Sequence, residues 1–229
     1  MSKTEVQNSI VGIVGRKGTG KSTYLRELLR RCPRFVVFDV MAEHSGQGHN
    51  RFESGAQLGR FLKWSRDKQT FAGAYVPGGD LEEEIEEASR LVYARGQVCF
   101  ACEEVPLYTH PGYMPPLLGK LIRTGRHRQI DIVWTAQRAA EVPKTLTALT
   151  DIWILFSQVE PRDLGALVDR CGREVADRVA ALGLHDFFVF DAVAHEAVQP
   201  SSRILKREFD KEPSRKPAVD GFQEAYGDM

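Results

Sequence analysis

The segment IVGIVGRKGTGKSTY, residues 10–24, constrains the fold more than any other feature of the chain. Its first five residues are apolar apart from one glycine, which predicts a buried strand. A glycine-rich loop and a helix-forming stretch follow. The fixed positions of the spacing G-x-x-x-x-G-K-[ST] are Gly15, Gly20, Lys21 and Ser22. A strand, loop and helix in this order direct backbone N–H groups and a helix N-terminus at one point, where phosphate can bind.

Short apolar runs alternate with longer amphipathic stretches along the rest of the chain. Several of the short runs are apolar at every position, as expected of central strands in a parallel sheet. The alternation predicts a three-layer α/β fold with a mostly parallel central sheet flanked by helices. Strands are expected near 9–14, 35–40, 71–76, 97–102, 130–136 and 152–157, with a last pair near 187–191 and 196–205. Helices are expected near 20–31, 55–66, 81–95, 115–125, 143–150, 161–171 and 173–182.

The length and composition fit one globular domain. Of the 229 residues, 42% are hydrophobic and 27% charged, which are ordinary values for such a domain. We expect a single domain over residues 1–205. Residues 206–229 mix charges with Pro and Gly and lack an apolar period, so we expect an arm or flexible tail there.

Charge and hydropathy exclude several classes of protein. The formal net charge is zero, so the chain is not a polycation that coats nucleic acid. The N-terminus has no apolar segment typical of a signal peptide. No run approaches the ~20 apolar residues that span a bilayer, so no membrane span is expected.

The cysteines and histidines do not predict a metal site. Cys99 and Cys102 form C-x-x-C within the apolar run VCFAC, but their side chains leave opposite faces of a strand. We therefore interpret them as small buried hydrophobic residues. His44 and His49 lie in a polar stretch without a metal-binding spacing, and we assign no metal site made of histidine.

The loop of residues 15–23 is the predicted nucleotide site. Lys21 is expected to reach the β- and γ-phosphates, and the Ser22 hydroxyl to hold Mg²⁺. The expected cofactors are therefore ATP and Mg²⁺. The predicted nucleotide-binding residues are Gly15, Arg16, Lys17, Gly18, Thr19, Gly20, Lys21, Ser22 and Thr23.

Two adjacent glutamates end the apolar strand in VCFACEEVP. A carboxylate at this position, Glu103, can hold Mg²⁺ through water, while Glu104 can orient and deprotonate an attacking water. The plainer interpretation is that the two glutamates only begin a loop. The buried strand directly before them favours the functional interpretation.

A glutamine and several arginines complete the candidate site. Gln137 follows the strand IDIVWTA, where it can contact the γ-phosphate or the attacking water. Arg123, Arg126 and Arg128 lie within six residues. They form either a solvated basic surface or the source of an arginine that enters a neighbouring subunit's site, which speeds hydrolysis by about 10³–10⁵.

Taken together, these stretches resemble the FtsK/HerA superfamily of P-loop motors. Within it, the chain is most similar to the genome-packaging ATPases of membrane-containing, tailless icosahedral viruses. The resemblance covers roughly residues 8–191. It rests on GRKGTGKST, VCFACEE, GRHRQIDIVWTAQR with the following EVPKT, and DIWILFSQVEPRDL.

The resemblance implies a RecA-like (ASCE) P-loop fold in which the strand IDIVWTA lies between the loop strand and the acid-pair strand. It implies a DNA-translocating ATPase that forms rings, commonly hexamers, and packages a viral genome into a preformed capsid. The implied partners are double-stranded DNA without sequence preference, other copies of the chain, and capsid or portal-vertex proteins. The implied location is the virion's packaging vertex and the host cytoplasm.

Residue by residue, the resemblance assigns the metal-side acid to Glu103, the catalytic glutamate to Glu104 and the sensor to Gln137. It places a basic interface residue at Arg126, and leaves open whether Arg126 or Arg123 acts in trans. Two positions depart from the family. Glu103 stands where Asp is commoner, and Ala139 follows TAQR where Pro is usual.

Other functions fit parts of the sequence. A nucleotide or small-molecule kinase also combines this loop with a chain of similar length, but no arginine-rich lid is apparent. An NTP-driven assembly or secretion factor would be expected to carry a membrane span, and a non-hydrolysing module does not need Glu104. For DNA contact, the basic candidates are residues 51–68 and 126–128, both of which can equally be ordinary surface.

Overall fold

The structure is a computed structural model that describes residues 9–44 and 49–198. Within these residues nine strands form one sheet in the order β3-β4-β2-β5-β6-β1-β7-β8-β9. Neighbouring strands from β3 to β7 are parallel, whereas β8 and β9 are antiparallel to their neighbours. The strands are β1 (Ile10–Val14), β2 (Arg34–Phe38), β3 (Asn50–Phe52), β4 (Phe71–Tyr75), β5 (Val98–Cys102), β6 (Ile130–Ala136), β7 (Ile152–Phe156), β8 (Phe187–Asp191) and β9 (Glu196–Val198).

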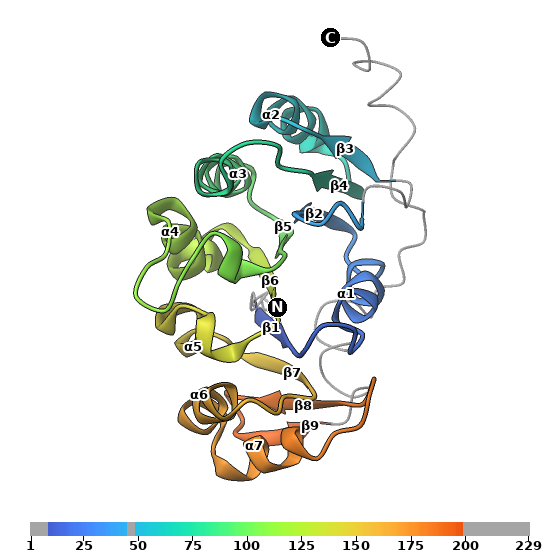
Figure 1. Ribbon diagram of the computed structural model, residues 1–229. Coiled ribbons are helices and arrows are strands. Elements are labelled where there is room, and N and C mark those ends of the chain that lie inside the picture. The colour runs from blue at the N-terminus through green and yellow to red at the C-terminus, as the bar shows by residue number, and fades with distance from the viewer. Residues whose placement is uncertain (1–8, 45–48, 199–229) are drawn as a thin grey trace.

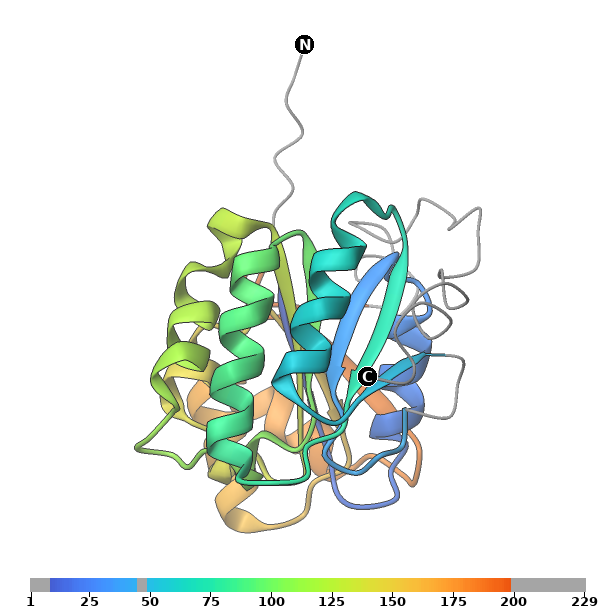
Figure 2. The same cartoon turned by 90° about the horizontal axis from the view of Figure 1, so that it is seen from above.

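Helices cover both faces of the sheet unequally. In Figures 1 and 2, α2, α3 and α4 lie side by side on one face, and α1 lies on the other. The core is divided in the same way, because the apolar residues of α2 to α7 and those of α1 belong to separate clusters. The helices are α1 (Lys21–Leu29), α2 (Gly55–Trp64), α3 (Leu81–Arg95), α4 (Pro116–Thr124), α5 (Lys144–Ala148), α6 (Pro161–Cys171) and α7 (Arg173–Ala180).

Central strand β5 is buried on both faces. Phe100 and Cys102 pack in the cluster below α2 to α7, whereas Cys99 and Ala101 pack in the cluster below α1. Side chains alternate between the faces because a strand has a period of two residues. Both cysteines are free and buried, so their interpretation as small hydrophobic residues is confirmed.

The strand β6 lies between β1 and β5, as the resemblance implied. Its Trp134 packs over Gly12 of β1 so closely that a Cβ at position 12 would lie 2.4 Å from the indole. The indole N–H donates to the Thr150 hydroxyl at 3.0 Å, which satisfies its one polar group in the core. Because β1, β5 and β6 are parallel, the segments that follow them meet at the carboxyl edge of the sheet.

Helix α3 shows how local sequence sets an element's bounds. The Asp80 carboxylate accepts the backbone N–H groups of Glu82 at 2.9 Å and Glu83 at 3.0 Å. This cap satisfies two of the N–H groups that the first turn leaves free, and such a cap stabilises a helix by about 1 kcal/mol. Gly96, with φ of +63°, ends the helix in a conformation that favours glycine.

The predicted fold class is confirmed, and most predicted elements agree with the structure to within a few residues. The strand β3 was missed, because it is three residues long and polar at its first two positions. The expected strand at 196–205 is described only as far as Val198, and the expected tail at 206–229 lies outside the described residues. Within the described ranges, no helix has the length and apolar character needed to cross a membrane.

Candidate functional site

The loop between β1 and α1 is anchored to the two strands beside β1. The backbone N–H of Gly15 donates to the Ala136 carbonyl at the end of β6, at 3.2 Å. The N–H of Arg16 donates to the Ser157 carbonyl just after β7, at 3.3 Å. Because both contacts use backbone groups of the neighbouring strand ends, the sheet itself fixes where the loop begins.

Three glycines give the loop its course. A Cβ at Gly15 would lie 2.4 Å from the Phe156 Cβ, so the backbone passes where no larger residue fits. Gly18 and Gly20 have φ of +79° and +107°, in the left-handed region that side chains disfavour. The two fixed glycines of the motif, Gly15 and Gly20, are therefore required for different steric reasons.

Lys21 begins α1 and is buried. Its ammonium donates to the loop carbonyls of Gly15 at 2.7 Å and Arg16 at 3.2 Å, and lies 4.0 Å from the Glu104 carboxylate. Burial lowers the pKa of Lys21, and the negative charge of Glu104 opposes that shift. The ammonium is thus held at the centre of the loop by weak acceptors that an anionic ligand can replace.

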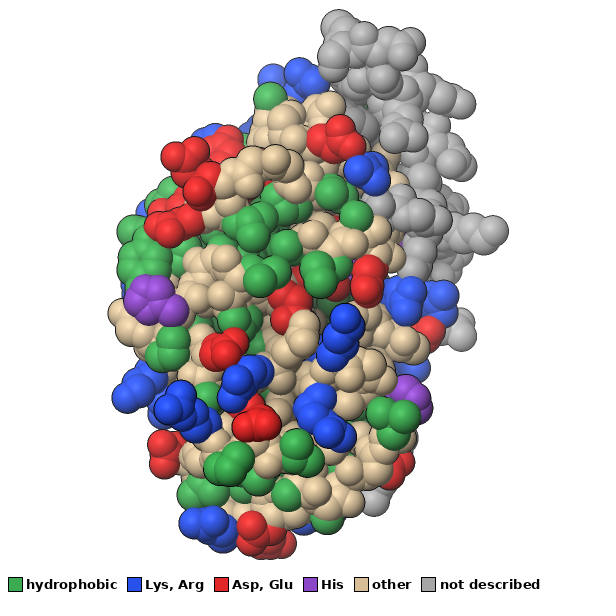
Figure 3. Space-filling view, viewed as in Figure 1, with side chains coloured by type: hydrophobic (Ala, Val, Ile, Leu, Met, Phe, Trp, Pro, Cys, Tyr) green, Lys and Arg blue, Asp and Glu red, His purple; other side chains and the backbone are tan. Residues whose placement is uncertain are grey.

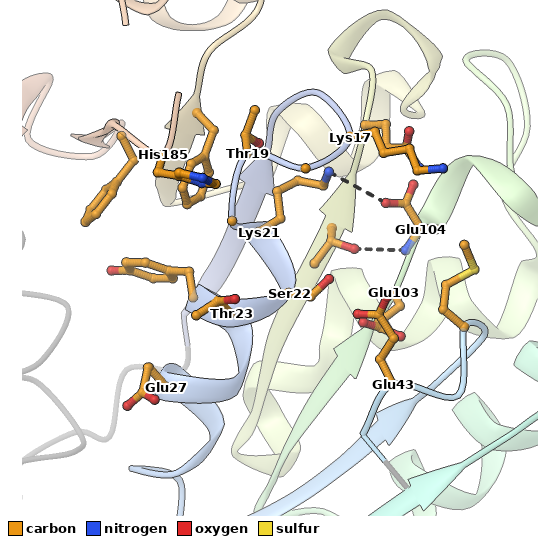
Figure 4. A pocket seen from close by; sticks show the side chains of 18 residues that line it. Lys17, Thr19, Lys21, Ser22, Thr23, Glu27, Glu43, Glu103, Glu104 and His185 are labelled. Carbon is orange, nitrogen blue, oxygen red and sulfur yellow. Dashed lines mark hydrogen bonds and ion pairs between the residues drawn. The ribbon is translucent and has the colours of Figure 1, made fainter. Parts of the chain in front are cut away.

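Glu103 and Glu104 follow β5 and point in different directions (Figure 4). Glu104 has φ of +43° and ψ of +56°, and its N–H donates to the Thr135 hydroxyl at 2.9 Å. This left-handed turn, which costs a non-glycine residue about 1–2 kcal/mol, aims Glu104 at Lys21. Burial raises the pKa of Glu104, while Lys21 and hydrogen bonding to Gln137 oppose the shift.

Glu103 is almost fully buried. Its Oε1 is 2.8 Å from the His44 Nε2, while its Oε2 has no hydrogen-bond partner among the described residues. Burial raises the pKa of Glu103, and the His44 contact opposes the shift. His44, which the sequence analysis assigned to a polar loop, is fully buried, because Asp39 accepts its backbone N–H at 2.9 Å and turns the loop inward.

Gln137 lies directly after β6, beside the acid pair. Its backbone carbonyl accepts from the Gln158 side chain at 2.8 Å, which fixes the segment that leaves the strand. Its side chain and its backbone both form hydrogen bonds with Glu104 that lower the pKa of that carboxyl. The glutamine and the second glutamate of the acid pair therefore act as one unit across two neighbouring strands.

A cavity of about 670 Å³ lies over these groups. Seven of the nine predicted loop residues line it, whereas Gly15 and Arg16 contribute through the backbone contacts above. Figure 3 shows acidic side chains near the middle of this face, beside a group of Lys and Arg side chains. The lining consists of Lys17, Gly18, Thr19, Gly20, Lys21, Ser22, Thr23, Tyr24, Glu27, Met41, Glu43, Glu103, Glu104, Thr135, Gln137, Phe156, His185 and Phe187.

Part of the cavity wall is aromatic, and no motif in the sequence predicted it. The Tyr24 ring meets the Phe187 ring edge-on with centroids 5.0 Å apart, and Phe156 lies 5.4 Å from Phe187. His185 lies beside this group in the lining. These residues come from α1, β7, β8 and the segment before β8, so no single stretch of sequence carries the signal.

The oxygen groups near Ser22 fit a magnesium ion. In Figure 4 the Ser22 hydroxyl and the carboxylates of Glu43 and Glu103 face the same part of the cavity. Magnesium prefers oxygen ligands and keeps several waters, and the unpaired buried Oε2 of Glu103 offers an acceptor for such a water. The residues present therefore suit the ion that the sequence analysis expects.

The arginine cluster lies at the opposite edge of the sheet. A 3₁₀ turn over Gly125–Arg128 precedes β6, and Gln137 follows it, so the seven residues of β6, roughly 20 Å, separate the two. Arg126 is exposed, and no ion pair or hydrogen bond of its side chain occurs with the described residues. Arg123 is also exposed, and its guanidinium lies over Gly119 of its own helix.

Two other arginines have structural partners. Arg128 donates to the carbonyls of Tyr93 at 3.2 Å and Ala94 at 2.9 Å, near the end of α3. Arg138, which follows Gln137, donates to the buried Asp163 carboxylate at 3.2 Å. These contacts hold helices to the sheet and do not involve the cavity.

The basic stretch 51–68 forms β3, α2 and a short turn at one end of the sheet. Its apolar residues Leu58, Phe61 and Leu62 are buried below α2. Among its cations, Arg51 pairs with Glu53 at 2.9 Å, and Lys68 lies 4.9 Å from the Trp64 ring centroid. None of these residues lines the cavity.

Comparison with known proteins gave matches among solved structures. No protein-family model and no curated protein matches the sequence. The genome packaging NTPase B204 from Sulfolobus turreted icosahedral virus 2, in complex with AMPPCP, has a TM-score of 0.68 and 18% identity over 83% of this chain and 95% of that one. The DNA-packaging ATPase B204 from Sulfolobus Turreted Icosahedral Virus has a TM-score of 0.61 and 20% identity over 84% and 97%. VirB4 of Thermoanaerobacter pseudethanolicus has a TM-score of 0.57 and 11% identity over 86% and 90%.

The chain has the P-loop NTPase fold. The matches extend over most of this chain and over almost all of both B204 chains. The fold implied by the resemblance to the FtsK/HerA superfamily is therefore confirmed.

Proposed function

We propose that this chain is an ATP-hydrolysing motor that moves double-stranded DNA and packages a viral genome into a capsid. The observation that carries the ATPase part is the position of the Glu104 carboxylate. It lies 4.0 Å from Lys21 and is hydrogen-bonded with Gln137, at the rim of a cavity that the phosphate loop borders. A triphosphate on the loop would have its terminal phosphate next to this carboxylate.

Each residue then has a defined part in hydrolysis. Lys21 would exchange the loop carbonyls for the β- and γ-phosphate oxygens, whose negative charge is a stronger partner. Glu104 would take a proton from the attacking water, and its raised pKa brings it closer to the operating pH, as suits a general base. Gln137 would orient that water between its own side chain and the phosphate.

Magnesium would be held by the Ser22 hydroxyl directly and by Glu103 through water. When bound, the ion supplies charge neutralisation for the phosphate oxygens. The protein's contribution is the unpaired Oε2 of Glu103, which burial keeps from bulk solvent.

The aromatic part of the cavity would receive the nucleotide base. Tyr24 and Phe187 offer ring surfaces beside the loop, and rings of this kind stack on bases without reading their identity. The cavity volume of about 670 Å³ is within the usual range for a site that binds a small ligand.

Motion along DNA is proposed from the likeness to the B204 proteins, which are named as a genome packaging NTPase and a DNA-packaging ATPase. We propose that copies of the chain form a ring, commonly a hexamer, in which Arg126 of one copy serves the next. Arg123 stays the second candidate for that role.

DNA would pass through the ring and contact basic residues in 51–68 or 126–128, and capsid or portal-vertex proteins would hold the ring at the packaging vertex. The chain would then act in the host cytoplasm and in the virion.

The experiment that tests this function measures ATP hydrolysis by the full chain with and without double-stranded DNA, beside its mass in solution with ATP. We expect hydrolysis that DNA stimulates and a mass that increases several-fold with ATP. Lys21→Ala serves as the matched control, because it removes the phosphate grip and keeps the surface unchanged.

A kinase would instead transfer the phosphate to a small acceptor as a monomer, with no response to DNA. An assembly factor would hydrolyse ATP without a response to DNA. Either pattern, or ATP binding without any turnover, would contradict the motor.

A further inference from the structure

The loop after β2 carries a buried histidine that the proposed hydrolysis does not use. Asp39 follows β2 directly and is fully buried. Its two carboxylate oxygens accept the backbone N–H groups of Glu43 at 2.8 Å and His44 at 2.9 Å. The loop is thus folded around one carboxylate. The consequence is that the His44 imidazole enters the protein below the cavity instead of pointing to solvent.

The imidazole contacts one oxygen of the metal-side glutamate. His44 Nε2 lies 2.8 Å from Glu103 Oε1. When Glu103 is ionised, its oxygens can only accept, so Nε2 then donates the hydrogen bond. The other oxygen, Oε2, is buried and has no partner among the residues that the structure describes. The histidine therefore occupies Oε1 and leaves Oε2 without a donor, beside the cavity that Glu103 lines. The buried Asp39 carboxylate also lies close to Glu103 and raises the pKa of that carboxyl.

A glutamate needs such a partner more than an aspartate does. Its side chain has one more rotatable bond, and the last torsion of a carboxylate is broad, so an unheld Glu103 could turn both oxygens away from the cavity. Outer groups that hold a metal-binding carboxylate typically change metal affinity by about 10- to 100-fold.

We propose that His44 is a positioning residue that fixes the Glu103 carboxylate, so that Oε2 faces the divalent cation bound with the nucleotide. This inference rests on the proposed function, since it assumes that a cation and nucleotide bind in the cavity. It adds to the site a residue that lies 59 positions before its partner in the sequence.

The same atoms permit one rival arrangement. Ligand atoms of Asp39, His44 and Glu103 all lie within 4.8 Å of one another, so the imidazole could be a direct metal ligand. His44 Nδ1 is buried without a hydrogen-bond partner among the described residues, so it is the ring atom that a direct ligand would use. Both Asp39 oxygens already accept backbone N–H groups and Nε2 already contacts Oε1, and these contacts favour positioning. The two arrangements differ in what a side-chain amide at position 44 would do.

The test measures Mn²⁺ binding to the full chain with saturating ADP, by the electron paramagnetic resonance signal of free Mn²⁺. Manganese accepts the same oxygen ligands as magnesium. His44→Leu removes the donor and should weaken Mn²⁺ binding by about 10- to 100-fold. His44→Gln keeps an N–H donor and should stay within about threefold of the wild type. His110→Leu, at an exposed histidine that does not line the cavity, is the control and should bind Mn²⁺ as the wild type does.

A double-mutant cycle separates positioning from a general effect on folding. In the Glu103→Gln background, His44→Leu should change Mn²⁺ affinity by less than about twofold, because residues that act through one another are not additive. Additive losses would overturn the proposal, as would wild-type affinity in His44→Leu. Equal losses in His44→Gln and His44→Leu would make the imidazole itself a ligand and would also overturn it.

Two measurements keep the outcome separate from failures elsewhere. Thermal melting of each variant reports folding, and His44→Met, which fills similar space without an N–H donor, replaces His44→Leu if that variant does not fold. Mn²⁺ binding with ADP needs no turnover. A wild-type protein that binds Mn²⁺ and ADP but does not hydrolyse ATP would therefore contradict the proposed function and leave the proposal for His44 standing.

Discussion

The two ends of β6 differ in almost every physical respect. At its carboxyl end, Thr135 and Gln137 are tied by hydrogen bonds to Glu104, and the groups around them are largely buried. At its amino end, Arg126 is exposed in a short turn, and the neighbouring Arg128 is used to hold the end of α3.

This difference indicates how the chemistry is divided. The carboxyl end holds the acid pair, the glutamine and one buried ammonium, so under the proposed function a single chain carries the parts that would activate water. The amino end lies roughly 20 Å away and cannot reach its own cavity. In the proposed motor, an arginine from that end would therefore act on a second molecule.

The largest expected effect is the removal of Arg126. Arg126→Ala should lower ATP turnover of the assembled chain by about 10³-fold or more, because an arginine supplied in trans stabilises charge in the transition state. Steady-state hydrolysis with DNA present measures this change. Arg123→Ala, which removes the second candidate on the same surface, is measured beside it, and the variant with the larger loss identifies the arginine that acts.

Mixing two variants tests directly whether the arginine of one molecule serves the nucleotide site of another. A mixture of Arg126→Ala and Lys21→Ala should recover part of the turnover, since some interfaces then combine an intact loop with an intact arginine. No recovery in mixtures that are shown to co-assemble would mean that the two ends of β6 do not serve different molecules.

The next effect concerns the carboxyl end. Glu104→Gln should bind ATP with nearly unchanged affinity yet lower the turnover rate by about 10²–10⁴-fold, because the amide cannot accept the proton from water. In the wild type, turnover should fall as the pH drops through the raised pKa of Glu104, since the base is active only when deprotonated. Full activity of Glu104→Gln, measured by phosphate release, would remove the proposed base.

Lys21→Ala should lower the turnover rate by about 10²–10³-fold, the usual loss for one charge-stabilising donor. It should also weaken ATP binding, which Glu104→Gln should not. Fluorescent nucleotide titration separates the two variants. Equal ATP affinity in Lys21→Ala and the wild type would contradict the docking of phosphate on this ammonium.

The smallest expected effect concerns Arg128, which has structural partners, in contrast to the exposed Arg126 of the same turn. Arg128→Ala should reduce the free energy of unfolding by about 1 kcal/mol, because it removes hydrogen bonds to the carbonyls of Tyr93 and Ala94. For a chain of this size the melting temperature should fall by about 2–4 °C. Turnover per folded molecule should stay as in the wild type, and a loss as large as in Arg126→Ala would mean that the turn acts as a whole.

Much of the fold was predictable because local patterns and global arrangement agree. The strands β1, β5 and β6 are apolar on both faces, and helix α3 carries its own start and stop in Asp80 and Gly96. The edge strand β3 was not predictable, since its pairing with β4 is set by the sheet and leaves little trace in a three-residue polar segment.

The candidate site was predictable only where the residues belong to short motifs. Lys21, Ser22 and the acid pair are marked by spacing and by the strand before them. His44 and Phe187 have no such mark, because their places at the cavity follow from how β2 and β8 lie in the sheet. For Arg128 the sequence was misleading in the other direction. It belongs to a cluster of arginines that suggested a functional role, but its side chain donates to carbonyls at the end of α3.

The left-handed backbone at Glu104 matters for anyone who engineers this protein. A residue with a β-carbon is held there in an unfavourable conformation with a largely buried carboxylate, so Gly or Asn at this position would relax the turn. If Glu104 is the proposed base, a library screened for heat resistance alone would enrich inactive clones at position 104. Any effort to stabilise this protein should therefore keep Glu104 unchanged.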